Sequence, residues 1–305
     1  MYEEELASQQ TSLQNTTSEP ICAPFSLILP VYNEENGILP TLDLIQENLQ
    51  PSGCVYEIIA VNDGSSDRSS ELLHSRNDIR VIEHRVNRGY GAALKTGIRH
   101  AKYPIIAITD ADGTYPNERL PQLVALMKNA DMVVGARIGE NVQYSNLRKI
   151  PKWFLIRFAQ WLTNTKIPDL NSGMRVFDKS VVERFITILP NTFSFTTTIT
   201  VAMLTNNYAV HYEPIDFHHR HGKSKIKPIR DTLRFVQLIL RTGMYFAPLR
   251  VFLPVAGLFF IGFLFTLVQD IVVRENLTER TLILLIAATQ MSMFALLADM
   301  LDKRV

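Results

Sequence analysis

The segment from Ile105 to Gly113 constrains the fold more than any other part of the chain. It is an aliphatic run that leads directly into two carboxylates, Asp110 and Asp112. A short apolar run bounded by Pro104 and Gly113 predicts a parallel strand that is covered on both faces. Ligands of an open α/β sheet bind at the carboxyl ends of such strands. Two acids at that place repel each other unless a cation lies between them, and oxygen ligands without Cys or His favour Mg2+ or Mn2+.

Two upstream segments show the same pattern of an apolar run that ends in polar residues. Residues 25–31 and 57–62 are aliphatic, each ends in polar turn-forming residues, and a helical pattern follows each. This alternation predicts an α/β domain with a mostly parallel, doubly wound sheet. The acids that follow the strands, including Glu34 and Asp63, are expected to converge with Asp110 on one crevice.

The order of these motifs resembles the nucleotide-sugar domain (GT-A, Rossmann-like fold) of inverting family-2 glycosyltransferases, over about residues 25–225. The resemblance implies a metal ion on Asp110 and Asp112, with Asp112 also catalytic. It implies donor-nucleotide contacts from these residues: Pro30, Tyr32, Glu34, Asp63, Arg88, Lys95, Asp110 and Ala111. Asp63 offers an acceptor to a base N–H, although it can also serve as a helix cap and turn residue.

A glycine-rich turn at residues 87–97 opens a helical pattern and can hold phosphate on its backbone N–H groups. This raises the alternative of a dinucleotide-binding oxidoreductase. Leu94 occupies the third glycine position of that fingerprint, and the motif follows a third strand instead of the first. We therefore reject that alternative. In the resembled family this segment packs beside the donor, so the resemblance implies that Arg88 or Lys95 lies near the donor diphosphate.

The segment from Asp169 to Arg175 resembles the acceptor-side motif of the same family. Asp169 is expected to orient or polarise the attacking group, and Arg175 to clamp a phosphate, so both join Asp112 as catalytic candidates. The alternative is a structural Asp169–Arg175 ion pair.

Two basic segments rich in apolar or aromatic residues predict contact with a membrane surface. Residues 148–163 interleave cations with Trp and Phe, as in an amphipathic interfacial helix, and 226–247 predict an amphipathic juxtamembrane helix. From His218 to Arg250 there are eight Lys or Arg against one acid. Each cation near anionic lipid contributes roughly 1 kcal/mol. The Arg220–Lys225 segment resembles the lid motif of dolichol-phosphate mannose synthases and bacterial polyprenyl-phosphate glucosyltransferases. The expected acceptor-phosphate clamp is Arg148, Arg175, Arg220 and Lys225.

Two uncharged apolar runs, 251–268 and 281–298, lie near the C-terminus. A membrane span needs about 20 apolar residues, so residues 248–305 predict a two-helix anchor; the alternative is a buried hairpin in a soluble core. Cations flank the pair on both outer sides, which places the main domain and both termini in the cytoplasm by the positive-inside rule. Residues 1–24 are polar and predict a disordered tail, not a signal peptide.

Composition narrows the function further. A net charge of +1 over 305 residues gives no argument for nucleic-acid binding. Cys22 and Cys54 suggest no disulfide framework and are expected to be structural thiols. Interfacial aromatic residues make a homo-oligomer plausible.

The sequence predicts a membrane-anchored, metal-dependent, inverting transferase that moves one hexose from a nucleotide sugar to a polyprenyl phosphate. UDP-glucose is the first donor considered, and GDP-mannose with a dolichyl or polyprenyl acceptor stays open. A processive polysaccharide synthase is disfavoured because the chain has no Gln-x-x-Arg-Trp motif. A non-catalytic membrane scaffold that binds nucleotide sugars is the alternative outside enzymes, and the presence of both Asp110 and Asp112 argues against it.

Overall fold

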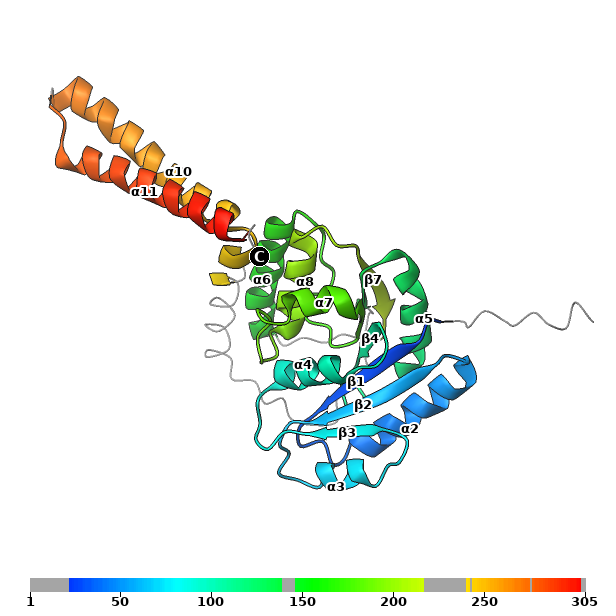
Figure 1. Cartoon of the computed structure of the whole chain (residues 1–305). Helices are drawn as coiled ribbons and strands as arrows, with labels where there is room; N and C mark the ends of the chain where they lie inside the picture. The colour runs from blue at the N-terminus through cyan, green and yellow to red at the C-terminus, as the bar shows by residue number, and fades with distance from the viewer. Residues whose placement is uncertain (1–21, 139–145, 217–239, 242, 275, 303–305) are drawn as a thin grey trace, which may run out of the picture.

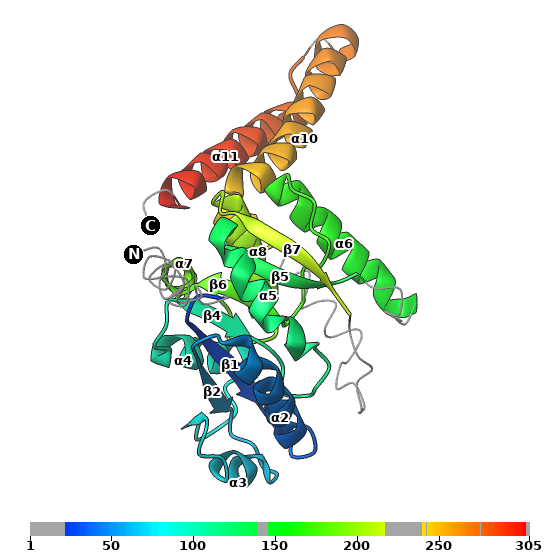
Figure 2. The ribbon, with the colours of Figure 1, turned by 90° about the vertical axis from the view of Figure 1, so that its right-hand side faces the viewer.

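The computed structural model of the chain describes residues 22–138, 146–216, 240, 241, 243–274 and 276–302. Within them, an α/β domain is followed by a hairpin of two long helices that projects away from it (Figure 1). The view in Figure 2 shows the same separation between the sheet domain and the hairpin. Both parts agree with the predicted α/β fold and with the two predicted C-terminal helices.

The sheet has seven strands in the order β3-β2-β1-β4-β6-β5-β7. Every pairing is parallel except those of β6, which is antiparallel to β4 and to β5. The predicted mostly parallel sheet is therefore confirmed. The strands are β1 (Phe25–Val31), β2 (Tyr56–Asn62), β3 (Arg80–Glu83), β4 (Ile105–Ile108), β5 (Met132–Arg137), β6 (Arg175–Asp178) and β7 (Val210–Ile215).

Helices cover both faces of this sheet, as the aliphatic strands require. One core cluster joins one sheet face to α2 (Ile38–Leu49), α3 (Ser69–His74) and α5 (Leu120–Ala125). The other joins the opposite face to α4 (Tyr90–His100), α7 (Lys179–Phe185) and α8 (Phe195–Thr205). Short 3-10 turns complete the domain: η1 (Gln50–Ser52), η2 (Asn117–Arg119) and η3 (Leu126–Asn129).

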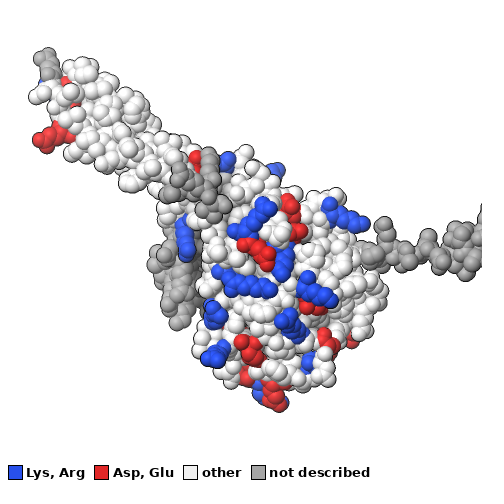
Figure 3. All heavy atoms as spheres, viewed as in Figure 1, with Lys and Arg blue, Asp and Glu red and all other residues white. Residues whose placement is uncertain are grey.

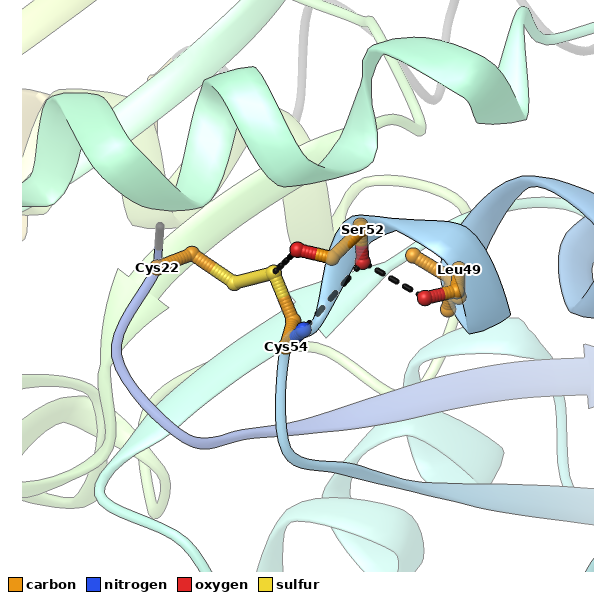
Figure 4. Close-up of a disulfide and its surroundings, with 4 residues drawn as sticks. All are labelled: Cys22, Leu49, Ser52 and Cys54. Carbon is orange, nitrogen blue, oxygen red and sulfur yellow. Dashed lines mark hydrogen bonds between the residues drawn. A yellow bond between two sulfur atoms is a disulfide. The ribbon is translucent and has the colours of Figure 1, made fainter. Parts of the chain in front are cut away.

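The two cysteines form a disulfide, Cys22–Cys54, so the expectation of free thiols is wrong (Figure 4). Parallel pairing of β1 with β2 sets Phe25 opposite Tyr56. This register brings the segments that precede the two strands together, and the cysteine Cα atoms lie 5.5 Å apart although 32 positions separate them. The bond ties the start of the described chain to the entry of β2.

The hairpin consists of α10 (Pro248–Gln269), a π-helical turn η4 (Asp270–Arg274) and α11 (Glu279–Asp302). Both helices are long and apolar enough to cross a membrane. Only 11% of the most apolar stretch of the first helix and 17% of that of the second are buried. A hairpin in a soluble core would be mostly buried, so that alternative does not fit. Figure 3 shows the viewed face of the hairpin almost without charge between its tip and the domain, whereas the domain carries mixed charges.

Helix α6 (Asn146–Thr163) forms over the predicted interfacial segment. Leu155, Ala159 and Leu162 are buried, whereas Trp153, Arg157 and Trp161 are exposed and, four residues apart, share one face. Most of the predicted juxtamembrane helix 226–247 and the predicted tail 1–24 lie outside the described residues.

Candidate active site

The predicted acids gather at the carboxyl edge of the parallel strands. Val31 at the end of β1 pairs with Asn62 of β2, and Ile28 pairs with Ile108 at the end of β4. The segments that follow these three strands therefore emerge on one side of the sheet. They carry the following predicted residues: Tyr32, Glu34, Asp63, Asp110, Ala111 and Asp112.

The two acids after β4 are half-buried and held from several sides. The Tyr90 hydroxyl at the start of α4 donates to Asp110 Oδ1 at 3.0 Å. Burial and the charge of Asp110 raise the pKa of Tyr90 well above its ordinary value, so this hydroxyl keeps its proton. A Cβ on Gly173 would come within 2.8 Å of Asp110 Oδ2, which explains the glycine there. Thr114 donates its N–H and hydroxyl to Asp112 Oδ1 at 3.2 and 2.6 Å.

Asp63 anchors the glycine-rich turn. Its carboxylate is buried and accepts the backbone N–H groups of Arg88 and Gly89 at 2.9 and 2.7 Å. His84 Nδ1 lies 2.6 Å from the same carboxylate, and its Nε2 lies 2.9 Å from Thr96 on α4. The structure thus shows the turn-holding role that the sequence left open, and the base contact stays a prediction. His84 was missed because no local motif marks it.

The segment after β1 is fixed by the loop after β2. Ser65 and Ser69 hydroxyls accept the backbone N–H groups of Asn33 and Glu34 at 3.0 and 2.9 Å. Asn33 adopts the left-handed region at φ 54°, which asparagine tolerates well. Pro30 and Glu34 are half-buried, and Tyr32 is exposed beyond the strand end. This placement leaves the Tyr32 ring accessible for the predicted stacking.

Arg88 and Lys95, the two cationic side chains predicted to contact the donor diphosphate, lie in different surroundings. Arg88 is exposed at the turn before α4. Lys95 lies farther along α4, where its ammonium donates to the Leu189 carbonyl and, at 2.9 Å, to Asn191 Oδ1. In this structure the Lys95 ammonium holds the loop after α7, and its donor-phosphate role stays a prediction. Ala111 is buried, and its carbonyl accepts the Thr41 hydroxyl at 3.2 Å.

Asp169 forms an ion pair with Arg137, a residue that no sequence motif indicated. Arg137, at the end of β5, donates Nε and Nη2 to the two carboxylate oxygens at 2.7 and 3.0 Å. Burial raises the pKa of Asp169, but the bonds and charge of Arg137 outweigh it, and the net pKa is lowered. The carboxylate is thus ionised and a weak base. The ion-pair partner of Asp169 is thus Arg137, and not Arg175 as in the alternative considered from the sequence.

Arg175 does not face the site. It is fully buried, and its guanidinium donates to the carbonyls of Ser172 and Leu170 at 2.7 and 2.9 Å and to the Thr200 hydroxyl at 2.6 Å. Burial lowers its pKa. A side chain without exposure cannot clamp a lipid phosphate, so the predicted catalytic and phosphate-binding roles for Arg175 are wrong. It supports the 170–172 loop from inside.

Three other predicted phosphate contacts stay predictions. Arg148 lies on α6, but its side chain is outside the described residues, as are Arg220 and Lys225 altogether.

Comparison with known proteins decides the family. A sequence profile described as Glycosyl transferase family 2 matches residues 26–186, more than half of the chain. The chain belongs to glycosyl transferase family 2. A second profile, described as the GtrB C-terminal hairpin, matches residues 247–303, the region of α10 and α11. This family-2 glycosyltransferase thus combines a catalytic domain with a recognised hairpin.

Among its relatives is the undecaprenyl-phosphate 4-deoxy-4-formamido-L-arabinose transferase of Pseudomonas paraeruginosa. That protein is 32% identical over 252 residues, which are 79% of this chain and 71% of the relative. A glucosyl-3-phosphoglycerate synthase from Mycobacterium tuberculosis, solved with phosphoglyceric acid, superposes with a TM-score of 0.58 at 18% identity. It covers 72% of this chain and 79% of its own. At this identity the likeness shows the GT-A fold alone.

The same mycobacterial enzyme was also solved with Mn2+, uridine diphosphate and phosphoglyceric acid (TM-score 0.56, 18% identity, 72% and 78% coverage). In the family-2 glycosyltransferase described here, Asp110 and Asp112 offer hard oxygen ligands that suit such an ion. Within the described residues no group of three His, Cys, Asp or Glu could hold a metal. Two carboxylates would leave the remaining ligand positions of such an ion to water or substrate phosphate.

Proposed function

We propose that this chain transfers one sugar, with inversion, from a nucleoside diphosphate sugar to a polyprenyl phosphate at the cytoplasmic face of a membrane. The observation that carries the proposal is the attachment of the acid-bearing domain to the hairpin. Arg250, in the first turn of α10, donates Nη1 to the carbonyls of Trp161 and Leu162 at 3.3 and 2.5 Å. The membrane hairpin is thereby fixed to the end of α6, and the relatives named for undecaprenyl phosphate support a lipid acceptor.

On the donor side, Asp110 and Asp112 would hold Mg2+ or Mn2+, which neutralises charge on the departing nucleoside diphosphate. Tyr90 and Thr114 orient these two carboxylates through the hydrogen bonds described above. Tyr32 is placed to stack on the nucleobase, and Arg88 to approach the diphosphate.

On the acceptor side, Arg137 binds the acceptor phosphate, the role that was expected of Arg175. Its side chain is 14% exposed, whereas Asp169 beneath it is 3% exposed. Asp169 fixes the guanidinium plane through two hydrogen bonds, and a positioned arginine fork suits the recognition of a phosphate. A phosphate monoester is already an anion at neutral pH and needs positioning more than deprotonation. The lowered pKa of Asp169 suits that role better than strong base catalysis.

The exposed face of α6 meets the lipid headgroups. Trp153 and Trp161 lie on either side of Arg157, and aromatic and cationic side chains together favour the interfacial zone. In this orientation α10 and α11 cross the bilayer, and the domain and both termini stay in the cytoplasm.

We propose UDP-glucose as the first donor, with GDP-mannose and a nucleotide-linked 4-formamido-arabinose as its competitors. The test incubates the purified full chain with Mn2+, polyprenyl phosphate and each labelled donor, and counts label that extracts with the lipid. Label carried into lipid from one donor is the expected result. Failure with every donor in the presence of Mn2+ and Mg2+ would overturn the proposal.

A further inference from the structure

Phe193 has no role in the proposed function, yet it contacts Tyr90, the residue that donates to Asp110. Phe193, in the loop between α7 and α8, is 80% exposed. Its ring stacks on Tyr90, with centroids 5.2 Å apart and planes 21° apart. The Tyr90 hydroxyl in turn donates to Asp110. A single exposed phenylalanine needs no explanation by itself, but this ring is one side chain removed from a predicted metal ligand.

The loop that carries Phe193 is held in place by the start of α4. A Cβ on Gly89 or Gly91 would collide with the backbone of Pro190 or Asn191, so the two segments are in direct backbone contact. Gly89 also has φ 101°, a value that favours glycine. Ala92 N–H donates to the Asn191 carbonyl at 3.2 Å.

Lys95 completes this attachment through its bonds to Leu189 and Asn191. Three separate features of α4 thus fix a short loop whose end presents an apolar ring to solvent. Ordering that loop lowers the entropy cost of using the ring as a binding surface.

The same loop leads to the acceptor side. Helix α8 follows it directly, and Thr197 of α8 donates to Asn171 Oδ1 at 2.6 Å, within the segment after Asp169. Val201 of α8 shares a buried cluster with Leu155 of α6. Because Arg250 of α10 donates to the Leu162 carbonyl of α6, a series of contacts through α8 and α6 connects the loop of Phe193 to the hairpin.

We propose that the Phe193 ring, backed by Tyr90, is a ledge on which the first isoprene units of the acceptor lie while their phosphate is at the site. This inference rests on the proposed function and names a residue that recognises the lipid part of the acceptor. The ring has no polar atom, so it suits hydrocarbon better than the hydroxyl groups of a sugar. Burying an apolar surface against it favours binding.

The test uses the detergent-solubilised full chain, one labelled donor, and farnesyl phosphate as a short acceptor. Phe193→Ala is compared with wild type and with Phe193→Leu, which keeps apolar bulk. We expect Phe193→Ala to raise KM for farnesyl phosphate roughly tenfold. The donor KM should stay within about twofold, because the proposal gives the ring contact with the lipid and with no part of the donor. Phe193→Leu is expected to recover part of the loss.

Leu44→Ala is the matched control, because Leu44 is an exposed apolar side chain on α2; it should match wild type. A raised donor KM with an unchanged acceptor KM would overturn the ledge and assign the ring to the sugar. Unchanged values for both substrates would also overturn it. If wild type itself transfers sugar to no prenyl phosphate, the proposed function fails, and that result is separate because it appears before any variant is compared.

Discussion

The donor and acceptor halves of the site are built differently. In the donor half, Asp63 and Asp112 accept hydrogen bonds from N–H groups of nearby turns, and their positions follow from the strand ends that precede them. In the acceptor half, Asp169 lies in the segment before β6 and is paired with Arg137, which lies 32 residues earlier at the end of β5. The comparison teaches that an acid directly after a strand can be placed from local sequence. Its distant partners, such as His84 for Asp63 and Arg137 for Asp169, depend on which segments become neighbours.

The largest expected effect is a loss of transfer rate when the donor half of the site is changed. Asp112→Ala removes one of the two proposed metal ligands while Thr114 and the strand end stay in place. We expect the rate of sugar transfer to fall by about 10²- to 10³-fold, as for loss of an electrostatic group at a reacting centre. Thr114→Val is the milder companion, because it leaves the carboxylate and removes only one of its hydrogen bonds. Equal rates for Asp112→Ala and wild type would show that the acids carry no ion.

On the acceptor side, Arg175→Met tests whether Arg175 supports the fold or contacts the acceptor phosphate. Arg175→Met removes buried donors from two carbonyls and from Thr200, so the free energy of unfolding should fall by about 3 kcal/mol. Denaturant unfolding measures this loss. In detergent at low temperature, the folded variant should keep the wild-type KM for polyprenyl phosphate. A variant with normal stability and a raised acceptor KM would restore Arg175 as a phosphate contact.

A pH series tests the Asp169–Arg137 pair. The pKa of Asp169 is lower in the folded protein than its ordinary value of 3.8, so its contribution to stability is present above that value and is lost as pH falls through the folded pKa. We expect wild type to be more stable than Asp169→Asn at pH 6 and the two unfolding free energies to converge below pH 3.8. A constant difference across the series would contradict the ion pair.

The smallest effect concerns the anchored turn of the donor half. Thr96→Val removes the hydroxyl beside His84 Nε2, with a cost of about 1 kcal/mol. Because His84 and Asp63 together hold the turn that carries Arg88, the donor KM should rise a few-fold while the acceptor KM stays constant. Steady-state kinetics with each substrate varied separately checks this. A change confined to the acceptor KM would place the turn in the other half.

Local patterns predicted β1, β2 and β4, the acid-bearing edge and the two long C-terminal helices, because each depends on residues adjacent in sequence. They failed where tertiary neighbours decide the role. The β1–β2 register creates the Cys22–Cys54 bond, and the buried carbonyls of Leu170 and Ser172 accept the Arg175 guanidinium. Phe193 carries no motif at all; only its stacking on Tyr90 reveals its place.

The account depends most on a divalent ion held by acids above a membrane surface. The direct test follows labelled sugar from the nucleotide into extractable lipid before chelation, after EDTA, and after Mn2+ is restored. The account predicts transfer, its loss on chelation and its return with the metal, all absent from Asp112→Ala. Transfer at an undiminished rate in EDTA would contradict it.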